Sequence, residues 1–389
     1  MILDIRETEY RQNPYPTFKK MRAEAPICKI APHHHWAIAK YADVQTILKN
    51  PQLFSSKIIA NPPAEGPGAL LFSCGLVTMD KPDHTRLRRL LSQAITPKII
   101  RSLKPKIQGL CETLVQNLSN KTEVDFVSTF SMPLPIIVIA ELLGIDSEKK
   151  TDFKRWANLL LTWRNQKSIA EIFHDVERMY YYFDDIIKAR KRAPQTDLIS
   201  HLVLASANET IITSEEILGL IRLLLVAGTE TTTNLLGNAI LALLAYPDNI
   251  ERLVADPTLI PNFIEETLRY DGPALSLNRK ATEDVELSGV KIRRGEIVLP
   301  LLASANHDEE IFEDPEHFDI ERNTKGHIAF GANVHYCLGS QLARLQARTA
   351  LEVFFKNIKH FQRVDNKPLV YLDSFFFRGP RSLPLKIWS

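Results

Sequence analysis

The stretch that decides the fold of this chain reads Phe330-Gly331-Ala332-Asn333-Val334-His335-Tyr336-Cys337-Leu338-Gly339. The next residues, from Ser340 to Arg348, have the pattern of a helix. A thiolate at Cys337 would lie at the start of that helix, where backbone N–H groups and the positive end of the helix dipole stabilise negative charge. A lone cysteine is more often buried for packing, but one thiolate with an open axial position suits haem iron.

The same stretch resembles the haem-binding signature of cytochromes P450, which is Phe-Gly-x-Gly-x-His-x-Cys-x-Gly followed by a Leu-Ala-Arg helix. The matching positions are Phe330, Gly331, His335, Cys337, Gly339, Leu342, Ala343 and Arg344. The resemblance implies that Cys337 ligates the iron of haem b and that Phe330 lies beside the cofactor. The chain departs from the signature at Asn333. Because asparagine tolerates a positive φ, we predict a glycine-like backbone conformation there.

The composition is that of a globular protein, with 389 residues of which 45% are hydrophobic and 24% are charged. A formal net charge of +2 gives no indication of nucleic-acid binding. The segment from Met1 to Glu7 does not resemble a signal peptide, and no apolar run reaches the ~20 residues that span a bilayer. We therefore expect a protein without a membrane anchor, located in the cytoplasm.

Cysteine and histidine spacing gives no sign of a structural metal or of disulfides. The four cysteines are Cys28, Cys74, Cys111 and Cys337, which are far apart in the sequence. This spacing favours a reducing compartment. The run from His33 to His35 could bind a metal, but adjacent side chains of an extended segment point in different directions. We predict a surface turn there, before a strand at Trp36–Lys40.

Helical periodicity dominates the chain and strand signals are short. We predict helices at Ala42–Leu48, Asp83–Ile95, Pro97–Leu118, Ser147–Asn165, Ser168–Arg192, Ser214–Ala245 and Pro261–Tyr270. Besides Trp36–Lys40, we predict strands at Asp284–Leu287, Val290–Ile292, Ile297–Leu301 and Leu385–Trp388, with a hairpin turn at Ser288-Gly289. The most loop-like stretch is Pro62–Gly68.

The predicted fold class is mainly α with small β-sheets. This agrees with the resemblance to cytochromes P450, which implies one domain over residues 1–389. The family's fold is a helix-rich triangular prism, with the haem between a long central helix and the cysteine loop.

The predicted long helix contains Ala227-Gly228-Thr229-Glu230-Thr231-Thr232-Thr233-Asn234. A glycine followed by β-branched residues disfavours a helix. The presence of this run in the middle of a predicted helix therefore indicates that function requires these residues. Gly228 would let a flat group lie against the backbone. The run resembles the P450 motif Ala/Gly-Gly-x-Asp/Glu-Thr-Thr, which implies that Glu230 and Thr231 deliver protons during oxygen activation. A carboxyl group and a hydroxyl group linked by water form such a relay.

Glu266 and Arg269 are three positions apart on a predicted helix and therefore share a face. Alone, such a pair is a common surface feature. Its position ahead of Phe312–Arg322 resembles the Glu-x-x-Arg helix and the meander of cytochromes P450. The resemblance implies a structural triad of Glu266, Arg269 and Arg322 that braces the cysteine loop.

Four basic residues match positions that contact the haem propionates in bacterial cytochromes P450. His84 and Arg88 share one face of a predicted helix, Arg279 follows a short apolar run, and His335 precedes Cys337 by two residues. Taken singly, each of them is more often a solvated or ion-paired residue. Their combination with the cysteine loop favours the propionate assignment.

The resemblance places the substrate near Ile58–Val77, Leu159–Phe183 and Phe375–Phe377. The individual pocket candidates are Leu223, Val226, Ala227, Leu275, Leu277 and Phe376. They are apolar, which favours an apolar small-molecule substrate. The alternative is that these side chains are core residues, as apolar stripes usually are.

The resemblance implies a haem-thiolate monooxygenase that inserts one oxygen atom from O2 into its substrate, by hydroxylation or epoxidation. We expect a monomer that receives electrons from a separate ferredoxin or flavodoxin. Arg86, Arg89, Arg344 and Arg348 would form a basic docking face, or else are scattered surface charges. Two alternatives are a peroxide-driven peroxygenase of the same fold, against which Glu230-Thr231 argues, and a non-catalytic haem-binding protein.

Overall fold

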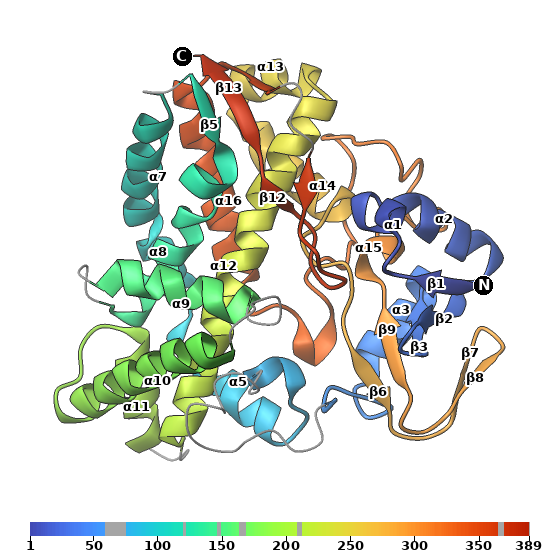
Figure 1. Cartoon of the computed structure of the whole chain (residues 1–389), viewed down its shortest axis with the longest axis horizontal. Coiled ribbons are helices and arrows are strands. Elements are labelled where there is room, and N and C mark those ends of the chain that lie inside the picture. The colour runs from blue at the N-terminus through green and yellow to red at the C-terminus, as the bar shows by residue number, and fades with distance from the viewer. Residues whose placement is uncertain are drawn as a thin grey trace. The chain divides into compact units, whose positions relative to one another are not determined.

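The computed structural model describes residues 1–58, 75–119, 122–145, 149–162, 169–207, 212–364 and 369–388 (Figure 1). The chain forms two compact units. Unit 1 consists of Met1–Ile58, Lys106–Ser131 and Thr231–Ser389, and unit 2 of Ile59–Pro105 and Met132–Glu230. The predicted loop at Pro62–Gly68 lies outside the described residues.

Unit 1 is built on a six-stranded sheet of order β1-β2-β3-β9-β6-β4. The strands are β1 (Ile2–Asp4), β2 (Ile27–Ala31), β3 (His35–Ile38), β4 (Phe54–Ser55), β6 (Arg279–Ala281) and β9 (Ile297–Pro300). Neighbouring residues of β3 and β9 belong to different cores, as the alternation of a strand requires. Ile38 and Val298 pack with α3 (Tyr41–Lys49), whereas Ala37 and Leu299 pack with α2 (Tyr15–Glu24).

The rest of unit 1 contains helices and small sheets. Its helices are α1 (Thr8–Gln12), most of α7 (Lys104–Ser119), η2 (Val127–Ser131), α13 (Asp248–Ala255), η5 (Pro257–Leu259), α14 (Ile260–Tyr270), α15 (Leu302–Ala305), η6 (Asn333–His335) and α16 (Ser340–Asn357). A three-stranded sheet joins β10 (His360–Arg363), β13 (Pro384–Trp388) and β5 (Glu123–Asp125), while β11 (Val370–Tyr371) pairs with β12 (Pro380–Ser382).

The predicted hairpin is present as β7 (Val285–Leu287) and β8 (Val290–Ile292). Its two turn residues have positive φ, 43° at Ser288 and 75° at Gly289. Two successive positive φ angles are typical of the tight turns that match the twist of a hairpin.

The described part of unit 2 is helical. It contains η1 (Gly75–Thr78), α5 (Asp83–Ala94), α6 (Pro97–Ser102), α8 (Pro133–Leu143), α9 (Lys150–Thr162), α10 (Ile169–Arg192) and α11 (Leu198–Ala207). The first half of α12 (Ser214–Ala245) completes the unit. Buried side chains such as Ile139, Trp156 and Phe183 form its core.

The prediction for α12 is confirmed residue for residue, from Ser214 to Ala245. The single helix predicted over Pro97–Leu118 is wrong, because the structure has α6 and α7 on either side of Leu103. The reason is Pro105, which has no N–H to donate to the carbonyl of Arg101 and so interrupts the helical ladder.

The turn predicted at His33–His35 is confirmed for His33 and His34, which lie between β2 and β3, and His34 has a φ of 55°. His35 is instead the first residue of β3. Within the described residues, no three His, Cys, Asp or Glu side chains gather in a way that could hold a metal ion. None of the helices in those same ranges combines the length and the apolar composition that crossing a bilayer requires.

Candidate functional site

The cysteine loop lies in unit 1, between Phe330 and the start of α16. Gly331 and Asn333 have positive φ angles of 70° and 56°, the left-handed backbone conformation typical of tight turns. The N–H of Cys337 donates to the carbonyl of Phe330 at 2.9 Å, and the N–H of Tyr336 donates to the carbonyl of Asn333 at 3.0 Å. These bonds fix the backbone that presents Cys337.

The glycine-like conformation predicted for Asn333 is confirmed by its φ of 56°. Its side chain has a second contact that the sequence did not predict. The Nδ2 group donates to the carbonyl of Lys49 at 2.9 Å, at the last residue of α3. Asn333 therefore provides both a tight turn and a tether, whereas glycine provides only the turn.

The environment of Cys337 fits a metal-bound thiolate. Helix α16 begins at Ser340, three residues after the sulfur, so its N-terminal dipole favours negative charge there. At Gly339 a Cβ atom would lie 3.9 Å from Cys337 Sγ, so this residue lies directly beside the sulfur. A single cysteine in this environment is the protein ligand that a haem-thiolate site requires.

Glu265 of α14 binds Arg344 of α16, which in turn contacts Phe330 of the cysteine loop. The sequence did not reveal this role, because it depends on residues that are distant in the chain. Its oxygens accept from Arg344 Nε at 2.6 Å and from Arg344 Nη2 at 2.7 Å, and one lies 3.0 Å from His327 Nε2. Burial raises the pKa of Glu265, but these bonds outweigh it and hold the pKa at about 2. Arg344 also stacks 4.5 Å from the ring of Phe330.

The structure brings Glu266, Arg269 and Arg322 together. The Nε of Arg269 lies 2.7 Å from Glu266 Oε2, and the Nε of Arg322 lies 3.2 Å from Glu266 Oε1. Glu266 and Arg269 have fully buried side chains. Arg269 also donates to the carbonyls of Asn306 and Pro315, at 2.9 and 3.0 Å, so the network holds the meander against α14.

Two of the predicted propionate contacts lie in unit 1. Arg279 is 4% exposed at the start of β6, and its Nη1 donates to the carbonyl of Asn278 at 2.7 Å. His335 lies on the cysteine loop, with its Nε2 3.0 Å from Ser56 Oγ. A buried guanidinium and a fixed imidazole are chemically suited to a carboxylate partner.

The other two predicted propionate contacts, His84 and Arg88, lie on α5 in unit 2. They are one helical turn apart, as predicted. His84 is buried, with 2% of its surface exposed, and Arg88 is partly buried.

Glu230 and Thr231 are consecutive residues of α12, and both are partly buried. Burial raises the pKa of the Glu230 carboxyl to about 7. A carboxyl group with that pKa exchanges its proton near neutral pH, which is the property of an efficient proton donor and acceptor.

Gly228 lies at a close contact between two helices that the sequence did not predict. A Cβ atom at this position would lie 2.8 Å from Ile139 Cδ1 on α8. The glycine therefore allows α8 and α12 to approach closely within unit 2. The role of Gly228 beside a flat cofactor stays a prediction.

The predicted pocket residues differ in exposure. Leu223 and Val226 are partly buried and Ala227 is exposed on α12. Leu275 is buried in a core cluster, against which Phe376 packs. Leu277 packs against the other core cluster of the sheet. Leu275 and Leu277 thus contribute to the packing around the sheet, and their contact with a substrate stays a prediction.

The basic docking face predicted from four arginines is weakened by ion pairs. Arg86 pairs with Glu216, Arg344 pairs with Glu265 and Arg348 lies 2.6 Å from Glu352. A paired guanidinium contributes little to a long-range field, so these three side chains do not form an uncompensated positive patch.

Comparison with known proteins identifies the family of the chain. The family model described as Cytochrome P450 matches residues 2–383. A curated relative, Cytochrome P450 109 of Bacillus spizizenii, is 36% identical over 392 residues, which cover 99% of this chain and 94% of the relative.

Two solved structures have the same fold. CYP109Q5 from Chondromyces apiculatus has a TM-score of 0.92 at 36% identity and covers 99% of this chain and 98% of its own. CYP109E1 from Bacillus megaterium, solved with corticosterone, has a TM-score of 0.86 at 34% identity, covering 97% of this chain and 99% of its own. The chain therefore belongs to the cytochrome P450 family of haem-thiolate monooxygenases.

Proposed function

We propose that this enzyme binds haem b through Cys337 and inserts one oxygen atom from O2 into an apolar small molecule, by hydroxylation or epoxidation. The observation that carries the proposal is the cysteine loop, with two positive φ angles ahead of Cys337 and a helix starting directly after it. The family match over residues 2–383 supports one P450 domain that includes both compact units.

The bound haem would supply oxygen activation, with a thiolate ligand that increases the electron density at the iron. The protein would hold that thiolate in place. Backbone bonds at Phe330 and Asn333 fix the loop, and the Glu265–Arg344 pair fixes Phe330 from the side. In unit 1, Arg279 and His335 would bind propionate oxygens, and in unit 2 we assign the same role to His84 and Arg88.

Glu230 and Thr231 would move protons to the reaction centre. The pKa of about 7 lets Glu230 hold a proton below neutral pH and release it above. The hydroxyl of Thr231 is the next group along the helix and would pass that proton on, through water. If Thr231→Ala leaves turnover and its coupling to electron consumption unchanged, the relay assignment is wrong.

The substrate proposal rests on apolar side chains and on one relative. Leu223 and Val226 lie on α12 within two turns of Glu230 and would contact an apolar body. CYP109E1 was solved with corticosterone, a steroid. We propose a hydrophobic substrate of moderate size, and a separate ferredoxin or flavodoxin as electron donor.

The decisive experiment is the absorption spectrum of the purified holoprotein after reduction under carbon monoxide. A Soret band at the position typical of thiolate ligation supports Cys337 as the ligand. The Cys337→Ser variant should fold, judged by circular dichroism, and lose that band. Absence of the band in well-folded wild-type holoprotein would refute the proposal.

A further inference from the structure

Glu265 of α14 is bonded to both ends of the segment that contains the cysteine loop, and all of these residues belong to unit 1. Ahead of the loop, Oε2 of Glu265 lies 3.0 Å from Nε2 of His327. Behind the loop, the same carboxylate accepts from Nε and Nη2 of Arg344, at 2.6 and 2.7 Å. A single carboxylate therefore connects the chain on either side of Cys337.

The hydrogen bonds of His327 show that it contributes no charge to this connection. The N–H of Ala329 donates to Nδ1 of His327 at 3.3 Å, so that nitrogen carries no proton of its own. The ring proton is then on Nε2, which donates to Glu265. The ionic partner of Glu265 is therefore Arg344.

The pair of Glu265 and Arg344 is ionic at neutral pH. Burial raises the pKa of Glu265, but the bonds from Arg344 and His327 outweigh burial and hold the pKa at about 2. The side chains of Arg344 and Glu265 are 33% and 23% exposed, so solvent screens them less than it screens a fully exposed pair. The carboxylate and the guanidinium thus compensate each other's charge.

Arg344 contacts two residues that are bonded directly to Cys337. Its guanidinium is 4.5 Å from the ring of Phe330, whose carbonyl accepts the N–H of Cys337 at 2.9 Å. Its Nη1 group lies 3.4 Å from the hydroxyl of Tyr336, the residue that precedes Cys337. A net charge on this guanidinium would therefore act on the cysteine loop from close range.

We propose that Glu265 is a positioning residue that controls the reduction potential of the haem iron, because it holds Arg344 against the cysteine loop and compensates its charge. This inference rests on the proposed function, since it takes Cys337 as the iron ligand. On reduction, the iron takes up one electron from the separate donor, and the site becomes more negative by one charge. An uncompensated positive charge beside the loop favours this change and raises the potential, whereas an uncompensated negative charge lowers it.

The test is spectroelectrochemical titration of the purified holoprotein. Glu265→Gln keeps the shape of the side chain but removes its charge. We expect the ratio of ferrous to ferric protein at a fixed potential to rise about tenfold, which is about 59 mV for a one-electron couple. Arg344→Gln leaves the carboxylate uncompensated and should lower the potential by a similar amount. The variant with both substitutions should have a potential close to that of the wild type.

A purely structural role for the pair predicts another pattern. Both single variants would then shift the potential in the same direction or not at all, and the double variant would differ from the wild type at least as much as either of them. That pattern would overturn the proposal. Arg344→Lys keeps the charge without the two parallel hydrogen bonds, and its potential should be close to that of the wild type. If Arg344→Lys behaves like Arg344→Gln, the charge is not the cause and the proposal is wrong.

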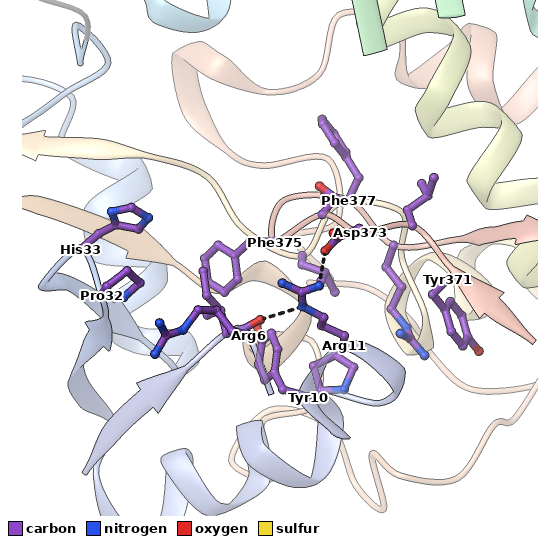
Figure 2. Close-up of a pocket in the computed structure, with 15 residues that line it drawn as sticks. Arg6, Tyr10, Arg11, Pro32, His33, Tyr371, Asp373, Phe375 and Phe377 are labelled. Atoms are coloured by element: carbon purple, nitrogen blue, oxygen red, sulfur yellow. Dashed lines mark hydrogen bonds and ion pairs between the residues drawn. The ribbon is translucent and has the colours of Figure 1, made fainter. Parts of the chain in front are cut away.

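Two matched controls leave an arginine without its carboxylate elsewhere in unit 1. Glu352→Gln does so for Arg348, one helical turn further along α16. Asp373→Asn does so for Arg11 beside a cavity next to α1, where Figure 2 shows the ion pair of 2.8 Å. No residue of the cysteine loop lines that cavity. Both controls should keep the wild-type potential, and a shift as large as that of Glu265→Gln would overturn the proposal.

The carbon monoxide spectrum separates this proposal from the proposed function. Every variant retains Cys337, so each should give the Soret band of a thiolate ligand, which also shows that the variant folds and binds haem. Wild-type protein without the band would refute the proposed function. Unshifted potentials in variants that have the band would refute the role of Glu265 alone. If Glu265→Gln loses the band, the difference between Arg344→Gln and Arg344→Lys still tests the effect of the charge.

Discussion

Glu230, to which we assign a role in proton transfer, has a largely buried carboxyl group. The raised pKa of this group makes the stability of the protein depend on pH. Burial raises the pKa from 4.5 to about 7, so the folded protein binds one more proton than the unfolded chain between these values. The contribution of Glu230 to the free energy of unfolding is therefore largest at low pH. It decreases as the pH rises from about 4.5 to about 7.

Glu230→Gln should remove this dependence. Relative to the wild type, the variant should become more stable by roughly 1–3 kcal/mol as the pH rises through this range, and the difference should then stay constant. Urea unfolding of both proteins at a series of pH values measures the effect. Parallel stability profiles would show that the carboxyl group titrates normally.

At the scale of elements, α14 and the meander are joined by the Glu266 network. Arg269 has a fully buried guanidinium whose carboxylate partner is Glu266. Glu266→Gln would leave that charge without compensation, and we expect a loss of about 3–5 kcal/mol in the free energy of unfolding. Glu352→Gln, which breaks the exposed pair with Arg348, is the control and should cost at most ~1 kcal/mol. A similar small loss in both variants would contradict the structural role of the triad.

The contact between α8 and α12 at Gly228 permits a double-mutant cycle. Alanine would add helix propensity, about 1 kcal/mol, but would place its Cβ 2.8 Å from Ile139 Cδ1. Gly228→Ala should therefore cost about 1–2 kcal/mol more in the native background than in an Ile139→Val background, where Cδ1 is absent. Thermal unfolding of the four proteins gives the coupling, and additive effects would exclude a close contact.

At the scale of the whole molecule, the formal net charge is +2 and the paired arginines leave no uncompensated patch among Arg86, Arg344 and Arg348. Electrostatic steering of an acidic electron donor should then be weak. We expect the second-order rate of reduction by a ferredoxin to fall by less than about tenfold between low and physiological ionic strength. Stopped-flow reduction at several salt concentrations measures this, and a steeper fall would indicate a basic docking face elsewhere.

The sequence predicted the fold class, the long helix α12, the β7–β8 hairpin and the conformation of Asn333, because each depends on local residue preferences. The break between α6 and α7 at Leu103 could also have been predicted from Pro105. It was missed because the helical periodicity continues across the proline. The contact of Gly228 with Ile139 and the ion pair of Glu265 with Arg344 could not be predicted. Both depend on which distant side chains meet, and such contacts leave no local pattern in the sequence.

The tether from Asn333 to the last carbonyl of α3 has a kinetic consequence. It joins the loop that presents Cys337 to a helix packed on the large sheet, so we expect the bond to slow any opening of the loop. Cofactor retention time, rather than affinity alone, should depend on it. Asn333→Gly keeps the backbone conformation but removes the tether, and we expect faster haem transfer to apomyoglobin with an unchanged carbon monoxide spectrum. An equal transfer rate would mean that loop opening does not limit haem loss.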